Sequence, residues 1–177
     1  MHLRHPPRLL LSERWSVPMA AGILRRSILL PRSVLHLSAN ELDGILAHEL
    51  AHHRRGDLAV IAFANLLLCV WWFDPLLWWI VRELRRVREE CCDDLVISSR
   101  LSDRGDYCAA LLRVAGMIDR PPSLASAGMA SHELCTRFTR ILDERVPKRA
   151  RLSTTGCLVV SALMMTLLPG AESNDDL

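Results

Sequence analysis

The feature that most constrains this chain of 177 residues is the pentapeptide HELAH at residues 48–52. Two histidines four positions apart lie on the same face of a helix, where both imidazoles can bind one zinc ion. Glu49 lies beside them and can reach a water at the metal, which is the arrangement of zincin peptidases. Because two histidines do not complete a catalytic zinc site, the fold must bring a third protein ligand to this segment.

The residues around the pentapeptide predict that it lies inside one helix. Ser38 and Glu41, three positions apart, form a capping box. Apolar residues then recur at helical spacing until Gly56, a residue that favours a helix end. We therefore predict a helix over residues 39–55.

The stretch REECCDD, residues 88–94, offers two candidate pairs of carboxylates for the third ligand. On a helix, Glu89 and Asp93 share one face, and Glu90 and Asp94 share another. Either pair can provide a ligand and an acid behind it. The apolar stripe of an ideal helix lies about equally far from both pairs, so periodicity does not choose between them.

The other metal-binding residue types are assigned to packing or to the surface. Cys91 and Cys92 can bind zinc as thiolates, but small reduced side chains that fill space near the site are the preferred interpretation. Tyr107 is a weaker alternative for stabilising an oxyanion. The histidines without metal-ligand spacing are predicted to be exposed: His2, His5, His36, His53 and His132.

The remaining pattern predicts a mainly α-helical fold. Residues 58–81 are almost uncharged, but Asp74 and Pro75 divide them, because proline is unfavourable inside a helix and suits its first turn. We expect a hairpin of helices over 57–72 and 75–99. Further helices are expected over 103–118 and 131–144, and one short edge strand over Ser27–Leu30.

Four tryptophans flank the turn of this hairpin, namely Trp71, Trp72, Trp78 and Trp79. They resemble the aromatic belt of a membrane interface, and the alternative is a tryptophan-rich corner of the core.

The C-terminal region predicts membrane attachment. Residues 152–171 carry no charge and follow the basic stretch 145–151, which predicts a transmembrane helix whose preceding side faces the cytoplasm. A buried core helix is the alternative. The expected organisation is a core over 1–151 that includes the hairpin at 57–99, a span over 152–171 and an acidic tail over 172–177. A net charge of +2, with the arginines in local runs, does not favour direct binding of nucleic acid.

Three segments, HELAHHRRGD, WWFDPLLWW and RRVREECCDD, resemble the core of the BlaR/MecR-type membrane zinc metallopeptidases. The likeness runs from about Val17 to the C-terminal span. It implies a zincin-like (gluzincin) core in which Glu89 is the third zinc ligand and Asp93 stands behind the ligands. Glu90 and Asp94 then become solvated neighbours. The residues after the zinc helix that match the family's motif are Arg54, Arg55 and Asp57.

The resemblance implies a membrane-associated, zinc-dependent endopeptidase. His48, His52 and Glu89 would bind Zn²⁺, and Glu49 would act as the base. The expected substrate is a regulatory protein such as a DNA-binding repressor, bound as an extended strand at the edge near Ser27–Leu30. The expected location is the bacterial inner membrane, in contact with lipid, with the zinc site on the cytoplasmic side.

Two departures from the family leave alternatives open. Signalling members usually have several membrane helices before the zinc helix, and the residues before His48 are too few and too polar for such a set. Only a short tail comes after the expected span, without the sensor domain of the signalling members, so β-lactam sensing is not inferred from the resemblance. The alternatives are a catalytically silent membrane regulator that keeps a structural zinc site, and a soluble helical binding module.

Overall fold

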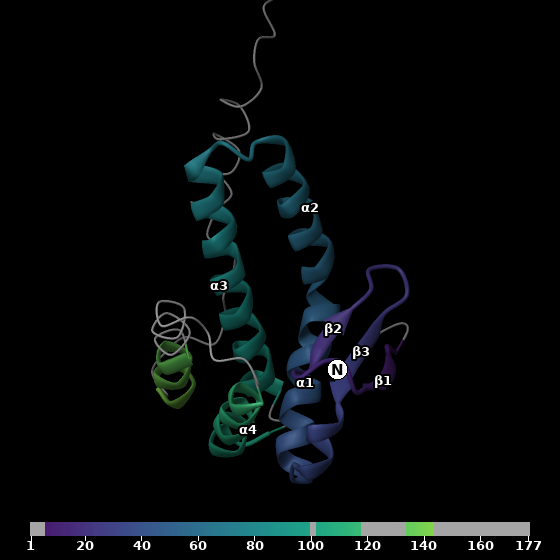
Figure 1. Cartoon of the computed structure of the whole chain (residues 1–177). Helices are drawn as coiled ribbons and strands as arrows, with labels where there is room; N and C mark the ends of the chain where they lie inside the picture. The colour runs from purple at the N-terminus through teal and green to yellow at the C-terminus, as the bar shows by residue number, and fades with distance from the viewer. Residues whose placement is uncertain (1–5, 100–101, 118–133, 144–177) are drawn as a thin grey trace, which may run out of the picture.

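The computed structural model describes residues 6–99, 102–117 and 134–143. Three strands come first, followed by a short 3₁₀ helix and four α-helices (Figure 1). The elements are β1 (Arg8–Ser12), β2 (Met19–Ala21), β3 (Ser27–Pro31), η1 (Arg32–His36), α1 (Ala39–Arg55), α2 (Asp57–Val70), α3 (Pro75–Ser99) and α4 (Arg104–Gly116). A further helical segment covers 134–142. The predicted mainly helical class is confirmed, with a small sheet beside the helices.

Local hydrogen bonds explain why α1 begins and ends where predicted. The backbone amide of Ser38 donates to the Glu41 carboxylate at 2.8 Å, and the Glu41 amide donates to the Ser38 hydroxyl at 3.3 Å. Gly56 adopts a left-handed conformation with φ 74°, which ends α1 and lets α2 begin one residue later. The predicted range 39–55 is confirmed.

The three-stranded sheet has the order β1-β3-β2, with β1 parallel and β2 antiparallel to β3. The predicted strand near Ser27–Leu30 is present, but its predicted position at an edge is wrong. Its residues Ile28 and Leu30 are buried against apolar side chains of α1, namely Leu42, Leu46 and Leu50. The strand that packs on α1 is therefore the middle strand of the sheet. Because β3 pairs on both sides, an extended substrate cannot add to it as a further strand.

Helices α2 and α3 form the predicted hairpin, whose turn extends away from α1 and α4 (Figure 1). Their shared core consists of Ala64, Leu68, Leu77 and Val81. At the turn, the Asp74 carboxylate accepts a hydrogen bond from the Leu76 amide at 2.8 Å. The first helix ends at Val70, slightly earlier than predicted. None of the described helices combines the length and apolar character needed to cross a membrane.

The tryptophans at the hairpin turn do not form a core corner. Trp72, Trp78 and Trp79 are 69%, 56% and 63% exposed, whereas Trp71 packs partly against the hairpin core. Exposed apolar side chains continue around them, including Phe73 and Leu76. A large part of the apolar surface at the hairpin tip is therefore uncovered in the described part of the chain.

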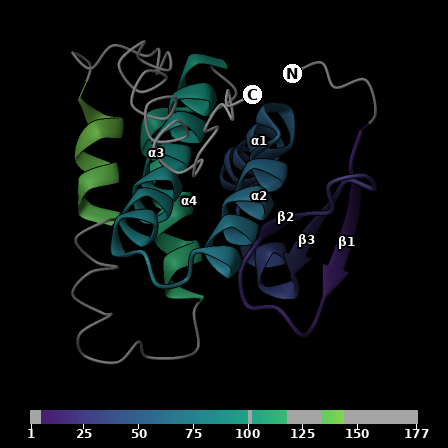
Figure 2. The ribbon, with the colours of Figure 1, turned by 90° about the horizontal axis from the view of Figure 1, so that it is seen from above.

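Helix α1 is the centre of the fold, with the sheet on one side and α3 and α4 on the other (Figures 1 and 2). The core between these helices and the segment 134–142 consists of Ala47, Val96, Tyr107, Leu111 and Ile141. Gly44 permits the close packing of α4, because a Cβ atom there would lie 3.1 Å from the Tyr107 ring. This packing brings Tyr107 to the turn of α1 that carries His48.

Several predictions fall wholly or partly outside the described residues. The transmembrane helix at 152–171, the acidic tail at 172–177 and the domain limit at 151 lie there. The helices predicted over 103–118 and 131–144 correspond to α4 and to the segment 134–142.

Candidate metal centre

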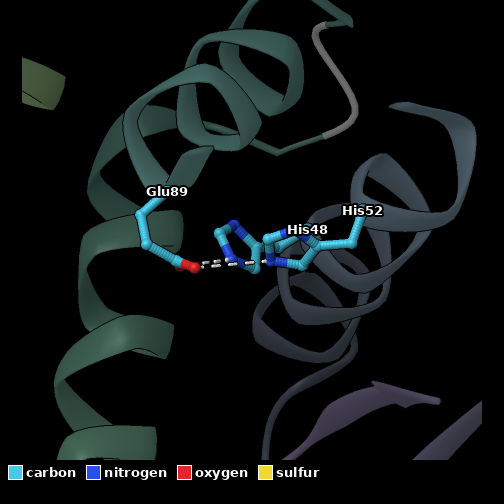
Figure 3. A group of neighbouring side chains, drawn as sticks. All are labelled: His48, His52 and Glu89. Atoms are coloured by element: carbon cyan, nitrogen blue, oxygen red, sulfur yellow. Dashed lines mark ion pairs between the residues drawn. The ribbon is translucent and has the colours of Figure 1, made fainter. Parts of the chain in front are cut away.

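Helices α1 and α3 bring two imidazoles and one carboxylate together (Figure 3). The Nε2 atom of His48 is 3.3 Å from Oε2 of Glu89, and Nε2 of His52 is 3.8 Å from Oε1 of the same carboxylate. Both histidines are buried, and the three donor atoms lie within 4.8 Å of one another. A set of two histidines and one glutamate is found in catalytic zinc sites, so these residues can hold such an ion.

Each imidazole is held from behind through its other ring nitrogen. The Nδ1 atom of His52 is 2.8 Å from Oδ2 of Asp57, and Nδ1 of His48 is 2.7 Å from the Tyr107 hydroxyl and 3.3 Å from Oδ1 of Asp93. The Tyr107 hydroxyl donates to Asp93 at 2.7 Å, so its oxygen can accept a hydrogen bond from the Nδ1–H group of His48. Both Nε2 atoms are then available to a metal, as in other histidine sites.

The site carries strongly interacting charges. Burial alone lowers the pKa of His48, but hydrogen bonds to Asp93 and Glu89 outweigh burial and raise this pKa to about 9. Burial raises the pKa of Glu89, but the two histidines more than reverse this and hold it far below its usual range. Below this pKa, metal binding at Nε2 is therefore expected to compete with a proton on His48.

The other two residues assigned to the site also lie close to the histidines. Glu49 is buried on α1, near enough to His48 for its charge to help raise the pKa of that histidine. Asp93 is buried on α3, with its Oδ1 atom 3.3 Å from Nδ1 of His48.

The thiol of Cys92 lies away from the metal-binding side of His52. The Cys92 sulfur is 3.2 Å from Nδ1 of His52 and 3.3 Å from Asp57, so it faces the nitrogen opposite Nε2. His52, Asp57 and Cys92 form a second group with metal-ligand atoms, but the Asp57 carboxylate already engages Nδ1. Burial and the nearby Asp57 charge raise the pKa of the Cys92 thiol well above its usual value. The geometry therefore favours a neutral thiol over a zinc ligand.

Two arginines of the segment 134–142 explain the density of carboxylates on α3. Arg137 donates to both carboxylate oxygens of Asp93 at 2.8 Å. Arg140 donates to Glu90 at 2.5 Å and to Asp94 at 2.6 Å. Each arginine thus engages one of the two pairs recognised in the sequence.

Glu90 and Asp94 are therefore not the solvated neighbours that we expected. Their side chains are only 20% and 11% exposed, because Arg140 bridges them to the neighbouring helix. Sequence reasoning missed both arginines. The sequence feature that could have revealed them is their spacing of three residues, which puts Arg137 and Arg140 on one face of a helix. The carboxylates of each pair on α3 are four residues apart, so they too share a helix face.

Two further expectations change. His53, predicted to be exposed, is buried, and its Nε2 atom is 2.8 Å from the Ser27 carbonyl oxygen, because this face of α1 packs on β3. Tyr107 is fully buried on the Nδ1 side of His48, so it cannot reach an oxyanion on the opposite side. Asp57, one of the motif residues after the zinc helix, is the first residue of α2, and its carboxylate contacts both Arg55 and His52.

Of the other histidines predicted at the surface, His36 is exposed, as expected. His2, His5 and His132 lie outside the described residues.

Replacing Tyr107 by Phe is expected to weaken metal binding about tenfold, the lower end of the range for residues that orient a ligand. The ring still fills its cavity, but His48 and Asp93 lose a shared hydrogen-bond partner. Chelator competition measures the affinity, and urea unfolding checks that the variant is folded. An unchanged affinity in a folded variant would show that Asp93 alone orients His48.

The chain matches known proteins in two comparisons. The family model described as BlaR1 peptidase M56 matches residues 1–141. The chain is also similar to "Regulatory protein BlaR1" of Bacillus licheniformis, with 31% identity over 159 residues. This alignment covers 87% of the chain and 25% of the relative, so the chain spans about a quarter of that protein's length.

Proposed function

The chain belongs to the BlaR1 peptidase M56 family, and on this premise we propose that it is a zinc-dependent endopeptidase. Membership of this family implies a metallopeptidase. The observation that carries the proposal is the convergence of His48, His52 and Glu89, with both imidazoles turned by acidic or phenolic partners so that Nε2 faces Glu89.

The proposed reaction is hydrolysis of a peptide bond. A zinc ion held by His48, His52 and Glu89 would lower the pKa of a water towards about 7 and polarise the scissile carbonyl. Glu49 takes a proton from the attacking water while the oxygen of that water bonds to the carbonyl carbon. The same carboxylate then delivers the proton to the leaving amine nitrogen as the C–N bond breaks.

The residues behind the ligands serve orientation in this mechanism. Asp57 holds the imidazole of His52, and Tyr107 with Asp93 holds that of His48. Rotation of either ring would turn Nε2 away from the shared position, so these contacts maintain the geometry that the reaction needs.

Removal of the metal tests the reaction class directly. Chelation is expected to reduce cleavage of an unfolded test protein to background, and stoichiometric zinc is expected to restore it. Cleavage can be followed by gel electrophoresis with the full chain in isolated membranes. Cleavage that persists with no detectable metal would rule out the proposed mechanism.

We further propose that the substrate is a regulatory protein, such as a DNA-binding repressor, and that the chain itself does not bind nucleic acid directly. Support comes from the relative, which is named a regulatory protein, and from the modest net charge of +2. Co-expression with candidate repressors, followed by mapping of the cut sites, tests this proposal. Repressors that remain intact beside a cleaved test protein would point to another substrate class.

The chain is also proposed to associate with the bacterial inner membrane, with the site on the cytoplasmic side. Support comes from the exposed apolar side chains at the hairpin tip, including Trp72, Trp78 and Trp79. Aromatic side chains of this kind favour the membrane interface, and uncovered apolar surface of this extent is unusual on a soluble monomer.

Two exposed cysteines allow a matched test of this location. Cys69 lies near the hairpin tip, whereas Cys135 lies in the segment 134–142 near the site. In inside-out vesicles, an impermeant maleimide is expected to label Cys135 at once and Cys69 only after detergent is added. Equal labelling of the two thiols in intact vesicles would contradict insertion of the hairpin tip.

A further inference from the structure

We infer that Arg137 is a positioning residue of the metal centre, so that the segment 134–142 completes the site. This inference rests on the proposed metal site, and it assigns a role to a residue that lies far from the HELAH helix in the sequence. Arg137 acts through Asp93 on His48, and it also faces the proposed ligand Glu89 directly.

The first observation is the bidentate contact between Arg137 and Asp93. The Nε and Nη2 atoms of Arg137 each donate to a different oxygen of the Asp93 carboxylate at 2.8 Å. Two parallel hydrogen bonds fix the plane of a carboxylate as well as its position. Because Asp93 is buried, the guanidinium also balances a charge that would otherwise be costly.

The second observation is which other groups the fixed carboxylate contacts. Oδ1 of Asp93 lies 3.3 Å from Nδ1 of His48 and accepts the Tyr107 hydroxyl at 2.7 Å. The orientation of the His48 imidazole therefore depends on where Asp93 is held. Arg137 helps to hold Asp93 in that position, because its Nη2 atom donates to the same Oδ1 at 2.8 Å and its Nε atom donates to Oδ2.

The third observation is a direct contact with the proposed ligand. Nη1 of Arg137 lies 3.6 Å from Oε2 of Glu89, the same oxygen that faces Nε2 of His48. One side chain thus restrains the carboxylate that would bind metal and the carboxylate behind the first histidine. With its side chain only 15% exposed, Arg137 makes these contacts largely out of water.

Arg140 provides a natural control on the same helical segment. Its side chain is 22% exposed and bridges Glu90 and Asp94 on α3, in the way that Arg137 bridges Glu89 and Asp93. Among the described residues, the set of side chains that can hold a metal between the two histidines contains Glu89, but it contains neither Glu90 nor Asp94. Both arginines attach the segment to α3, but only Arg137 contacts the metal-binding set.

The test compares Arg137→Lys with Arg140→Lys in the full chain. A lysine keeps the charge but cannot reproduce the bidentate fork. Metal affinity is measured by chelator competition, site geometry by the absorption spectrum of the Co²⁺-substituted protein, and folding by thermal unfolding. We expect similar small decreases in thermal stability for both variants. Arg137→Lys should weaken metal binding about 10- to 100-fold and alter the Co²⁺ spectrum, whereas Arg140→Lys should change neither.

The outcomes separate this inference from the proposed metal site. If wild type binds neither Zn²⁺ nor Co²⁺, both are overturned. If wild type binds metal and folded Arg137→Lys matches it in affinity and spectrum, or if both variants weaken binding equally, the role of Arg137 is overturned alone. Should Arg137→Lys fail to fold, Arg137→Gln, which keeps an amide donor, is compared with Arg140→Gln by the same criteria.

Discussion

Glu49→Gln is expected to retain metal and to lose peptide-bond cleavage by about 100- to 10,000-fold, the range for removal of a general acid–base group. Glutamine has nearly the same volume, so its buried position on α1 is still filled. Neither imidazole nor Glu89 is altered, so the metal-binding set remains. What is lost is the carboxylate that accepts a proton from water and returns it to the leaving nitrogen.

Metal content and cleavage must be measured on the same preparations for this prediction. Glu90→Gln is the matched control, because it neutralises another carboxylate near the site that pairs with arginines rather than histidines. Cleavage by Glu49→Gln at the wild-type rate would remove Glu49 from the mechanism. If wild type and variant both bind zinc and neither cleaves any protein, the catalytically silent regulator becomes the better interpretation.

Glu89→Gln is expected to lose metal affinity by more than about 100-fold, beyond the usual effect of residues that only orient a ligand. A neutral amide replaces the one carboxylate that faces both Nε2 atoms, at 3.3 Å from His48 and 3.8 Å from His52. Cleavage should fall with the metal occupancy. Binding can be measured by chelator competition and by metal analysis of the purified chain.

The comparison of Glu89→Gln with Glu90→Gln distinguishes the two carboxylate pairs of α3. The substitutions are adjacent and chemically identical, but Glu90 contacts Arg140 and Arg86. Glu90→Gln is therefore expected to bind metal as wild type does. Equal losses of metal in both variants would indicate a general effect on α3, and loss only in Glu90→Gln would reassign the third ligand.

Features that depend on near neighbours in the chain were predictable from the sequence. The capping box at Ser38 and the left-handed Gly56 limit α1, and Asp74 with Pro75 begins α3, because caps and proline act within one helical turn. The placement of His48 and His52 on one face follows in the same way from helical geometry. Family resemblance then implied Glu89 as the third metal ligand, whereas periodicity alone did not distinguish it from Glu90.

Contacts between elements were decided only by the tertiary structure. The rotation of α3 about its axis turns Glu89 towards the histidines and Glu90 towards Arg140, and the packing of α1 on β3 buries His53. The same packing makes β3 a central strand rather than an edge. Periodicity states which residues share a face, but not which face meets which neighbour. The sequence by itself therefore determined the helix that carries HELAH, and the tertiary structure decided how Arg137 and Tyr107 surround it.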